Sequence, residues 1–120
     1  MTLDEMSRIS LSDNVDIVVN DGCAVFAELD ALSLLNRNLA REDVARAIIE
    51  AVAVRVNSIL NDKVKPLPNT TVLIGGVSRN TALVKVLQRR SGINFLVPAR
   101  SEYAGALGAA LIAMDYKQGG

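Results

Sequence analysis

Two adjacent glycines are the first residues of this sequence whose type and position point to chemistry. Gly75 and Gly76 follow the β-rich run at 70–74 and precede a helix-forming segment, so they occupy a strand-to-helix turn, the place where open α/β sheets bind ligands. Because glycine has no Cβ, the pair lets the backbone approach a flat ring or a ribose closely. From position alone, however, a tight turn is the commoner role of Gly-Gly, and the pair matches neither a P-loop nor a G-x-G-x-x-G fingerprint.

The only cysteine, Cys23, is the second candidate. Asn20 and Asp21 are cap-type residues and predict that a helix begins near Cys23. The exposed N–H groups and the dipole at a helix start favour a thiolate, the form that binds metals or attacks electrophiles. A small buried apolar side chain is the commoner role of an intracellular cysteine, and one thiol cannot by itself hold an iron–sulfur cluster.

Composition excludes several classes of function. The 120 residues contain 13 Lys+Arg, 13 Asp+Glu and no His, and 50% of them are hydrophobic. A net charge of zero lacks the cationic excess of proteins that bind nucleic acids or anionic membranes. The absence of histidine removes imidazole-based triads and His-ligated zinc. No apolar stretch reaches the ~20 residues of a spanning helix, and no disulfide or leader pattern is present, so we expect a soluble, cytoplasmic chain.

Turn-forming residues divide the chain at an internal linker of about 63–69, which contains two prolines. Before the linker, residues 2–5 form a capping box that predicts a short helix, an extended run follows at 15–19, and a helix is expected from about 22 to 36. The clearest helix runs from 41 to about 61 with a wide apolar face, so it is expected to lie against a sheet or a second layer.

That helix also predicts two ion pairs. Glu42 with Arg46, and Arg46 with Glu50, are four residues apart, the spacing at which opposite charges on one helix are neighbours. Each pair is expected to contribute little to stability, because exposed pairs of this kind are weak.

After the prolines the pattern changes to alternating strands and helices. The predicted elements are a strand over 70–74, a helix over 81–90, a strand over 94–97 and a helix over 102–116. Asn80 or Ser78 is expected to cap the first of these helices, Gly92 to end it, and Ser101 to cap the last. This order predicts a parallel β-α-β unit and therefore an α/β fold.

The last predicted helix is rich in small residues. Gly105 and Gly108 each cost about 1 kcal/mol relative to alanine in a helix interior, so a compensating contact is required. Close packing against a neighbouring element is the commoner explanation, and close approach to a ligand is the alternative.

Taken together, three segments resemble the end of an actin-like ATPase domain, the superfamily of sugar kinases, chaperone ATPases and actin. They are VLIGGVSRN at 72–80, Pro98, and GALGAAL at 105–111. Within that superfamily, CAVFAE at 23–28 and the helix start RED at 41–43 resemble the BadF/BadG/BcrA/BcrD-type activator ATPases of 2-hydroxyacyl-CoA dehydratases and benzoyl-CoA reductases. The resemblance covers nearly the whole chain in the right order.

The resemblance implies a fold and an activity. Residues 1–120 would be a single partial domain, the C-terminal lobe of a ribonuclease H-like actin-type ATPase, with helices packed on a small, mainly parallel sheet. The activity implied is that of a homodimeric, ATP-driven electron donor to an acyl-CoA dehydratase or reductase component. Gly75, Gly76 and Asn80 match the stretch that holds the adenosine of ATP or ADP. Cys23 matches one of the two cysteines that each subunit gives to a shared 4Fe-4S cluster.

The resemblance also implies what this chain does not contribute. The phosphate loops that hold Mg²⁺ and the triphosphate belong to the protein's own N-terminal lobe, which has no counterpart in these residues. We therefore expect no catalytic residue here, no ATP hydrolysis and no bound cofactor in the chain alone.

Two alternatives remain open at this level. The chain fits a sugar-kinase-like lobe, since Gly-Gly and small-residue helices occur there too, or a non-catalytic interaction domain of the same fold. Cys23 discriminates between the activator and the kinase, because only the activator needs a cluster ligand at that position.

Overall fold

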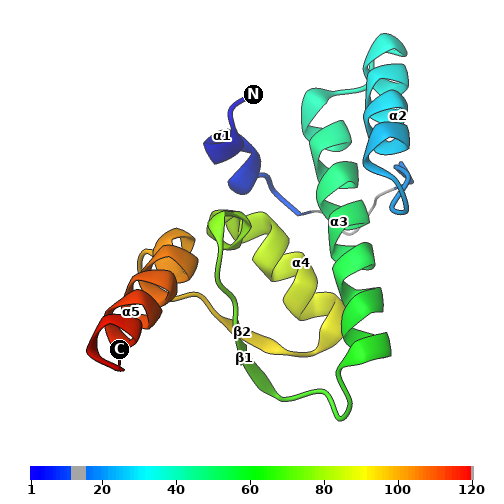
Figure 1. Cartoon of the computed structure of the whole chain (residues 1–120). Helices are drawn as coiled ribbons and strands as arrows, with labels where there is room; N and C mark the ends of the chain where they lie inside the picture. Colours follow the sequence, from blue (N-terminus) through cyan, green and yellow to red (C-terminus); the bar gives the residue numbers. More distant parts are fainter. Residues whose placement is uncertain (12–15, 120) are drawn as a thin grey trace.

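The computed structural model describes residues 1–11 and 16–119 (Figure 1). In chain order the elements are α1 (Leu3–Ser7), α2 (Ala24–Asn36), α3 (Arg41–Lys63), β1 (Thr70–Val72), the 3₁₀ turn η1 (Gly76–Arg79), α4 (Thr81–Ser91), β2 (Asn94–Leu96), the 3₁₀ turn η2 (Ser101–Tyr103) and α5 (Ala104–Gly119). Val15, the first residue of the predicted extended run, lies outside the described residues, and residues 16–19 form no strand.

The second half of the chain is the predicted parallel β-α-β unit. β1 and β2 pair in parallel, with Val72 opposite Leu96, and α4 forms the crossover between them. The strands are shorter than predicted, although the backbone N–H of Leu73 still donates to the carbonyl of Leu96 at 2.9 Å beyond the last pair. The α/β class with helices packed on a small parallel sheet is therefore confirmed.

The core lies between α3, α4 and the covered face of the sheet. Leu87 and Val86 are its largest fully buried side chains. The buried residues of this cluster are Ile49, Ala53, Ala82, Leu83, Val84, Val86, Leu87, Ile93 and Phe95. They come from α3, α4, β2 and the turn before β2, so one hydrophobic cluster joins the two halves of the chain.

A buried carboxylate joins α3 to α4. Glu50 is 8% exposed and binds two guanidinium groups, those of Arg89 and Arg90, the latter with its Nε and Nη2 at 2.9 and 2.6 Å. The predicted pairs of Arg46 with Glu42 and Glu50 are wrong, because Arg46 binds Asp43 at 2.7 Å. Glu50 faces α4 rather than its own helix, and two arginines there compensate the cost of its burial.

Two local signals that bound helices are confirmed. Thr2 and Glu5 form both hydrogen bonds of the predicted capping box, and the backbone N–H of Thr2 holds the pKa of Glu5 below its usual value. At the other end of α4, Gly92 has a φ of 73°, the left-handed conformation that ends a helix at little cost in glycine.

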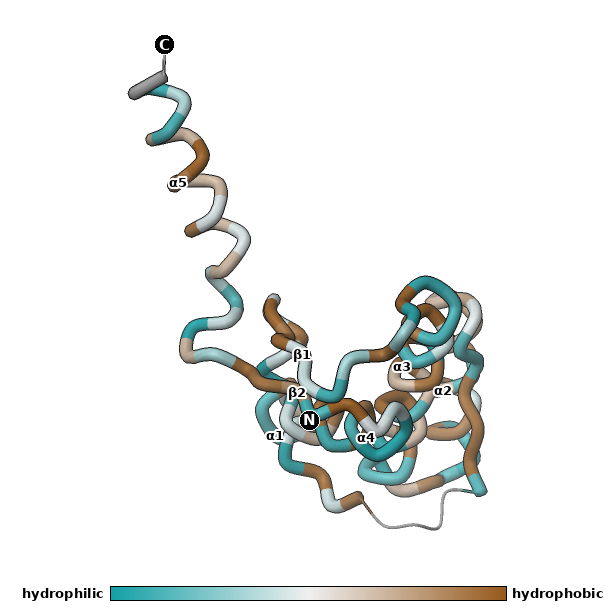
Figure 2. The backbone as a smooth tube through the Cα atoms, turned by 90° about the horizontal axis from the view of Figure 1, so that it is seen from below, coloured by the Kyte–Doolittle hydropathy of each residue, from teal (hydrophilic) through white to brown (hydrophobic). Residues whose placement is uncertain are grey.

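Helix α5 extends away from the body, as Figure 2 shows. The Cα radius of gyration is 17.2 Å, whereas a compact chain of this length has a radius of about 14 Å. The exposed apolar side chains of α5 include Leu107, Leu111, Ile112 and Met114. None of the helices in the described part of the chain has both the length and the apolar composition needed to cross a membrane.

The predicted close packing around the glycines of α5 is wrong for this chain. A Cβ built at Gly105 or Gly108 would meet no atom within 4 Å. The outer face of the sheet is open too, since Val72 and Leu96 are 59% and 51% exposed. Parallel sheets are normally covered on both faces. The outer face of this sheet and the glycine-bearing side of α5 are therefore surfaces that the described residues leave uncovered.

Truncation of the core tests this fold. Leu87→Ala is expected to lower the free energy of unfolding by about 2–5 kcal/mol, because it leaves a cavity between α3 and α4. The control Leu107→Ala removes the same atoms from the exposed surface of α5 and is expected to change it by less than about 0.5 kcal/mol. Urea unfolding followed by circular dichroism measures both, and equal losses would contradict the assigned core.

Candidate functional site

The two loops that follow β1 and β2 are joined by buried hydrogen bonds. The backbone N–H of Gly75 donates to the carbonyl of Ser101 at 2.9 Å. The hydroxyl of Ser78 donates to the carbonyl of Gly75 at 2.6 Å and lies 2.6 Å from the hydroxyl of Ser101. Because the single proton of Ser78 is already used, Ser101 donates the second bond. Both serines are 3% exposed or less, so the junction is fixed.

The glycine pair sits at this junction with an open face. Gly75 has a φ of 99°, a conformation that L side chains rarely adopt, and Gly76 begins η1. A Cβ at either position would meet no atom within 4 Å. The sequence therefore places glycine where the turn requires it, and the bare main chain is not covered by any described side chain. We call Gly75, Gly76 and this open face the glycine corner.

Asn80 caps the helix behind the glycine corner. Its side-chain Oδ1 accepts a hydrogen bond from the backbone N–H of Leu83 at 2.9 Å. Of the two predicted caps of α4, Asn80 is confirmed, whereas Ser78 serves the loop junction. The prediction that Ser101 caps the last helix is also wrong, because its hydroxyl binds Ser78 and the η2 turn precedes α5.

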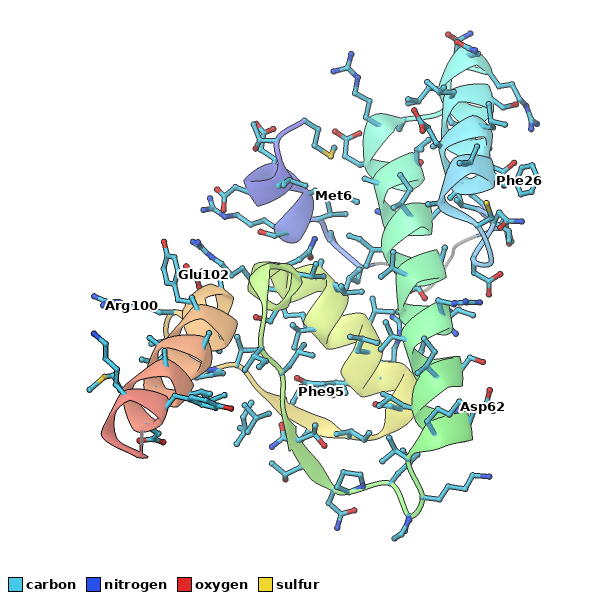
Figure 3. The ribbon with its side chains drawn as sticks, viewed as in Figure 1. Met6, Phe26, Asp62, Phe95, Arg100 and Glu102 are labelled. Carbon is cyan, nitrogen blue, oxygen red and sulfur yellow. The ribbon has the colours of Figure 1, made fainter. Side chains whose placement is uncertain are left out.

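An ion pair that sequence reasoning missed lies beside the glycine corner. Arg79 in η1 binds Glu102 in η2, with Nη1 and Oε1 2.9 Å apart. Glu102 lies in the turn that leads into α5 (Figure 3). Both residues follow strands of the predicted parallel β-α-β unit, and the carboxyl ends of parallel strands lie at one edge of a sheet, so the opposite charges of Arg79 and Glu102 were an available signal. Since the Arg79 side chain is 68% exposed, the pair adds little stability but places two polar groups next to the glycines.

Cys23 lies at the start of α2, as predicted. It occupies the N-cap position, and its backbone N–H donates to the Oδ1 of Asn20 at 2.9 Å. The thiol side chain is exposed, so the alternative of a buried apolar residue is wrong. An exposed sulfur at a helix start is accessible to a metal and lies near the partial positive charge of the helix.

The chain has a single thiol that could bind a metal. Cys23 is its single cysteine, and among residues 1–11 and 16–119 no three His, Cys, Asp or Glu side chains converge as a metal site. Cys23 could therefore fill at most one position of a cluster, whose other ligands would have to come from elsewhere. The structure does not bring Cys23 to the glycine corner, since α3 and α4 lie between them (Figure 1).

Comparison with known proteins gives consistent matches. The sequence model of the BadF/BadG/BcrA/BcrD ATPase family matches residues 4–113. The 2-hydroxyisocaproyl-CoA dehydratase activator of Clostridioides difficile is 35% identical over 111 residues, which are 92% of this chain and 41% of that protein. The chain thus spans about two-fifths of the length of this relative.

Two solved structures have the same fold. The activator of the 2-hydroxyisocaproyl-CoA dehydratase from Clostridium difficile, with bound ADPNP, superposes with a TM-score of 0.75 at 33% identity, over 97% of this chain and 41% of that one. Component A of the (R)-2-hydroxyglutaryl-CoA dehydratase of Acidaminococcus fermentans gives a TM-score of 0.72 at 29% identity, over 92% and 40%. These matches confirm the predicted actin-type fold class.

A matched pair of substitutions tests the geometry of the glycine corner. Gly75→Ala is expected to lower the free energy of unfolding by about 1–2 kcal/mol, because a Cβ at a φ of 99° strains the backbone. Gly76→Ala adds the same methyl group without a positive φ and is expected to cost less than about 0.5 kcal/mol. Chemical denaturation compares the two, and an equal loss in both variants would refute the assigned conformations.

Proposed function

The chain belongs to the BadF/BadG/BcrA/BcrD ATPase family, and from this membership we propose that it is the adenosine-binding lobe of a cytoplasmic, ATP-dependent activator of a 2-hydroxyacyl-CoA dehydratase. The observation that carries the proposal is the open glycine corner at the carboxyl end of β1. The names of matched relatives support it: the Clostridioides difficile protein is an activator of 2-hydroxyisocaproyl-CoA dehydratase and was solved with ADPNP, and the Acidaminococcus fermentans protein is component A of (R)-2-hydroxyglutaryl-CoA dehydratase.

In this proposal the adenosine lies against bare main chain. Gly75 and Gly76 allow the sugar and base to approach the backbone without meeting a side chain. Asn80 caps α4 directly behind them and would lie near the ribose. Arg79 and Glu102 stand beside the same corner as a charged pair. When bound with Mg²⁺, ATP would supply the phosphoanhydride bond whose hydrolysis drives electron transfer.

The chain's own residues bind the nucleoside but do not complete the reaction. Hydrolysis needs carboxylates that hold Mg²⁺ and groups that hold the triphosphate, and we assign these to an N-terminal lobe, the first partner of this chain. The exposed sheet face at Val72 and Leu96 and the exposed side of α5 are large apolar surfaces of the kind that a second lobe covers. Closure of the site by that lobe gives the nucleotide its second wall.

For electron transfer we assign Cys23 to a 4Fe-4S cluster shared by two copies of the complete protein. Its thiol is exposed at the start of α2, where the helix dipole favours an anionic, thiolate-bound cluster. Since one cysteine per chain cannot complete the ligand set, we assign the remaining ligands to a second copy of the chain and to cysteines of the N-terminal lobes. The electron acceptor, a dehydratase component, would then be the third partner.

Nucleotide binding is the first test. The isolated chain is expected to hydrolyse no ATP with Mg²⁺, whereas mixing it with a separately expressed N-terminal lobe is expected to restore turnover. In that complex Gly76→Ala should raise the Kd for ADP about tenfold, because the added methyl group occupies the face against which the nucleoside lies.

The matched control is Gly22→Ala, whose Cβ makes only an ordinary contact with the Asn20 side chain far from the glycine corner. It is expected to leave the Kd for ADP unchanged. Full turnover by the isolated chain, or equal Kd values for Gly76→Ala and the unaltered complex, would refute the proposed site.

The cluster assignment has a separate readout. After anaerobic reconstitution with iron and sulfide, the two-lobe complex is expected to be brown with a visible iron–sulfur band, and Cys23→Ser is expected to lose most of it. Ser33→Ala, an exposed change on the same helix, serves as control. ADP binding should survive both substitutions. An unchanged iron content in Cys23→Ser would eliminate Cys23 as a ligand.

A further inference from the structure

A groove runs along α4 on the side away from α3. It has a volume of about 680 Å³ and lies between α4 and the segment that follows β2. One end of the groove is lined by Ser78, Arg79, Thr81, Ser101 and Glu102. The rest is lined by Val84, Lys85 and Gln88 on α4 and by Val97, Pro98 and Arg100 on the segment that follows β2. The groove therefore combines an apolar lining with a basic residue from each of these two segments.

The charge around this groove differs from that of the chain as a whole. The chain carries equal numbers of basic and acidic residues. Residues 76–103, by contrast, contain Arg79, Lys85, Arg89, Arg90 and Arg100 against the single acid Glu102. Such segregation creates a local positive potential on a neutral protein.

Two of these cations are uncompensated. Arg89 and Arg90 bind Glu50, and Arg79 binds Glu102. Within the described part of the chain, neither Lys85 nor Arg100 forms an ion pair, and both are exposed. These two residues line the groove from two different segments, α4 and the turn that follows β2, so both would attract an anionic occupant.

Arg100 is held in a strained conformation. Its φ is 58° and its ψ is 34°, a left-handed geometry that costs a residue with a side chain about 1–2 kcal/mol. The backbone N–H of Tyr103 donates to its carbonyl at 3.0 Å and fixes the turn. The side chain extends outward from the body at this turn (Figure 3). Backbone strain of this kind concentrates at functional positions.

We propose that this groove binds an acidic peptide segment of a partner protein, in which carboxylates alternate with apolar side chains. The apolar side chains pack against Val84, Val97 and Pro98, while the carboxylates reach Lys85 and Arg100. Complementary charge of this sort provides specificity and speeds association more than it adds affinity. Ser78, Arg79, Ser101 and Glu102 of the loops beside the glycine corner also line this groove. A bound peptide would therefore lie next to the proposed nucleotide site, although neither Lys85 nor Arg100 belongs to the glycine corner.

Other anions fit the groove less well. A nucleic acid needs an extended basic surface, whereas the rest of this chain carries an acidic excess that repels it. A small anion such as phosphate needs several donors that converge on one point, whereas Lys85 and Arg100 line an open groove from two different segments. An extended peptide with carboxylates at intervals needs neither an extended basic surface nor converging donors, because each carboxylate can pair with one of the two cations that line the groove.

The test uses the full chain and a short fluorescein-labelled peptide that alternates glutamate with leucine. Fluorescence anisotropy at low salt is expected to show binding that weakens as salt is added. The double variant Lys85→Gln/Arg100→Asn should raise the Kd about tenfold. Asparagine tolerates the left-handed conformation at position 100, so the turn is kept, and Arg79 stays unaltered.

Two controls make the result decisive. The double variant Arg37→Gln/Lys65→Gln removes two exposed cations outside the groove and is expected to leave the Kd within about twofold. A peptide with glutamine in place of glutamate is expected not to bind. The proposal is overturned by absence of binding, by equal weakening in both double variants, or by displacement of the peptide by equimolar tripolyphosphate or a short oligonucleotide.

Discussion

The contact between α3 and α4 is the constraint on which the rest of the molecule depends. The buried residues of both helices form one cluster with Phe95 of β2, and Glu50 adds bonds to Arg89 and Arg90 at the far end of α4. A buried carboxylate is costly unless it is paired and hydrogen-bonded, so the three side chains hold one relative position of the helices. With α4 fixed, the two strands that it connects are fixed as well.

That position of α4 determines the geometry of the candidate site. The N-terminal end of α4 follows η1, so Asn80 anchors the loop that begins at Gly75. The second loop is then joined to the first through the hydroxyls of Ser78 and Ser101. A nucleotide bound here would meet a surface that is already organised, which lowers the entropic cost of binding.

Much of this arrangement follows from local sequence signals. The capping box at Thr2, the cap at Asn80 and the left-handed Gly92 act within a single turn, so residue type and spacing suffice to predict them. Such local rules could not predict that Glu50 pairs with Arg89 and Arg90, because this pairing depends on how α3 and α4 cross. The role of Ser101 was missed for the same reason, since its hydroxyl binds a loop 23 residues away in sequence. Non-local contacts decide between several roles that one residue type can fill.

The projecting α5 is expected to affect how fast the polypeptide is degraded in a cell. Its exposed Leu107, Leu111 and Ile112 resemble the surface that chaperones and quality-control proteases recognise in unassembled subunits. If a second lobe covers this face, as proposed, copies in which the face stays uncovered are expected to be degraded faster than covered ones.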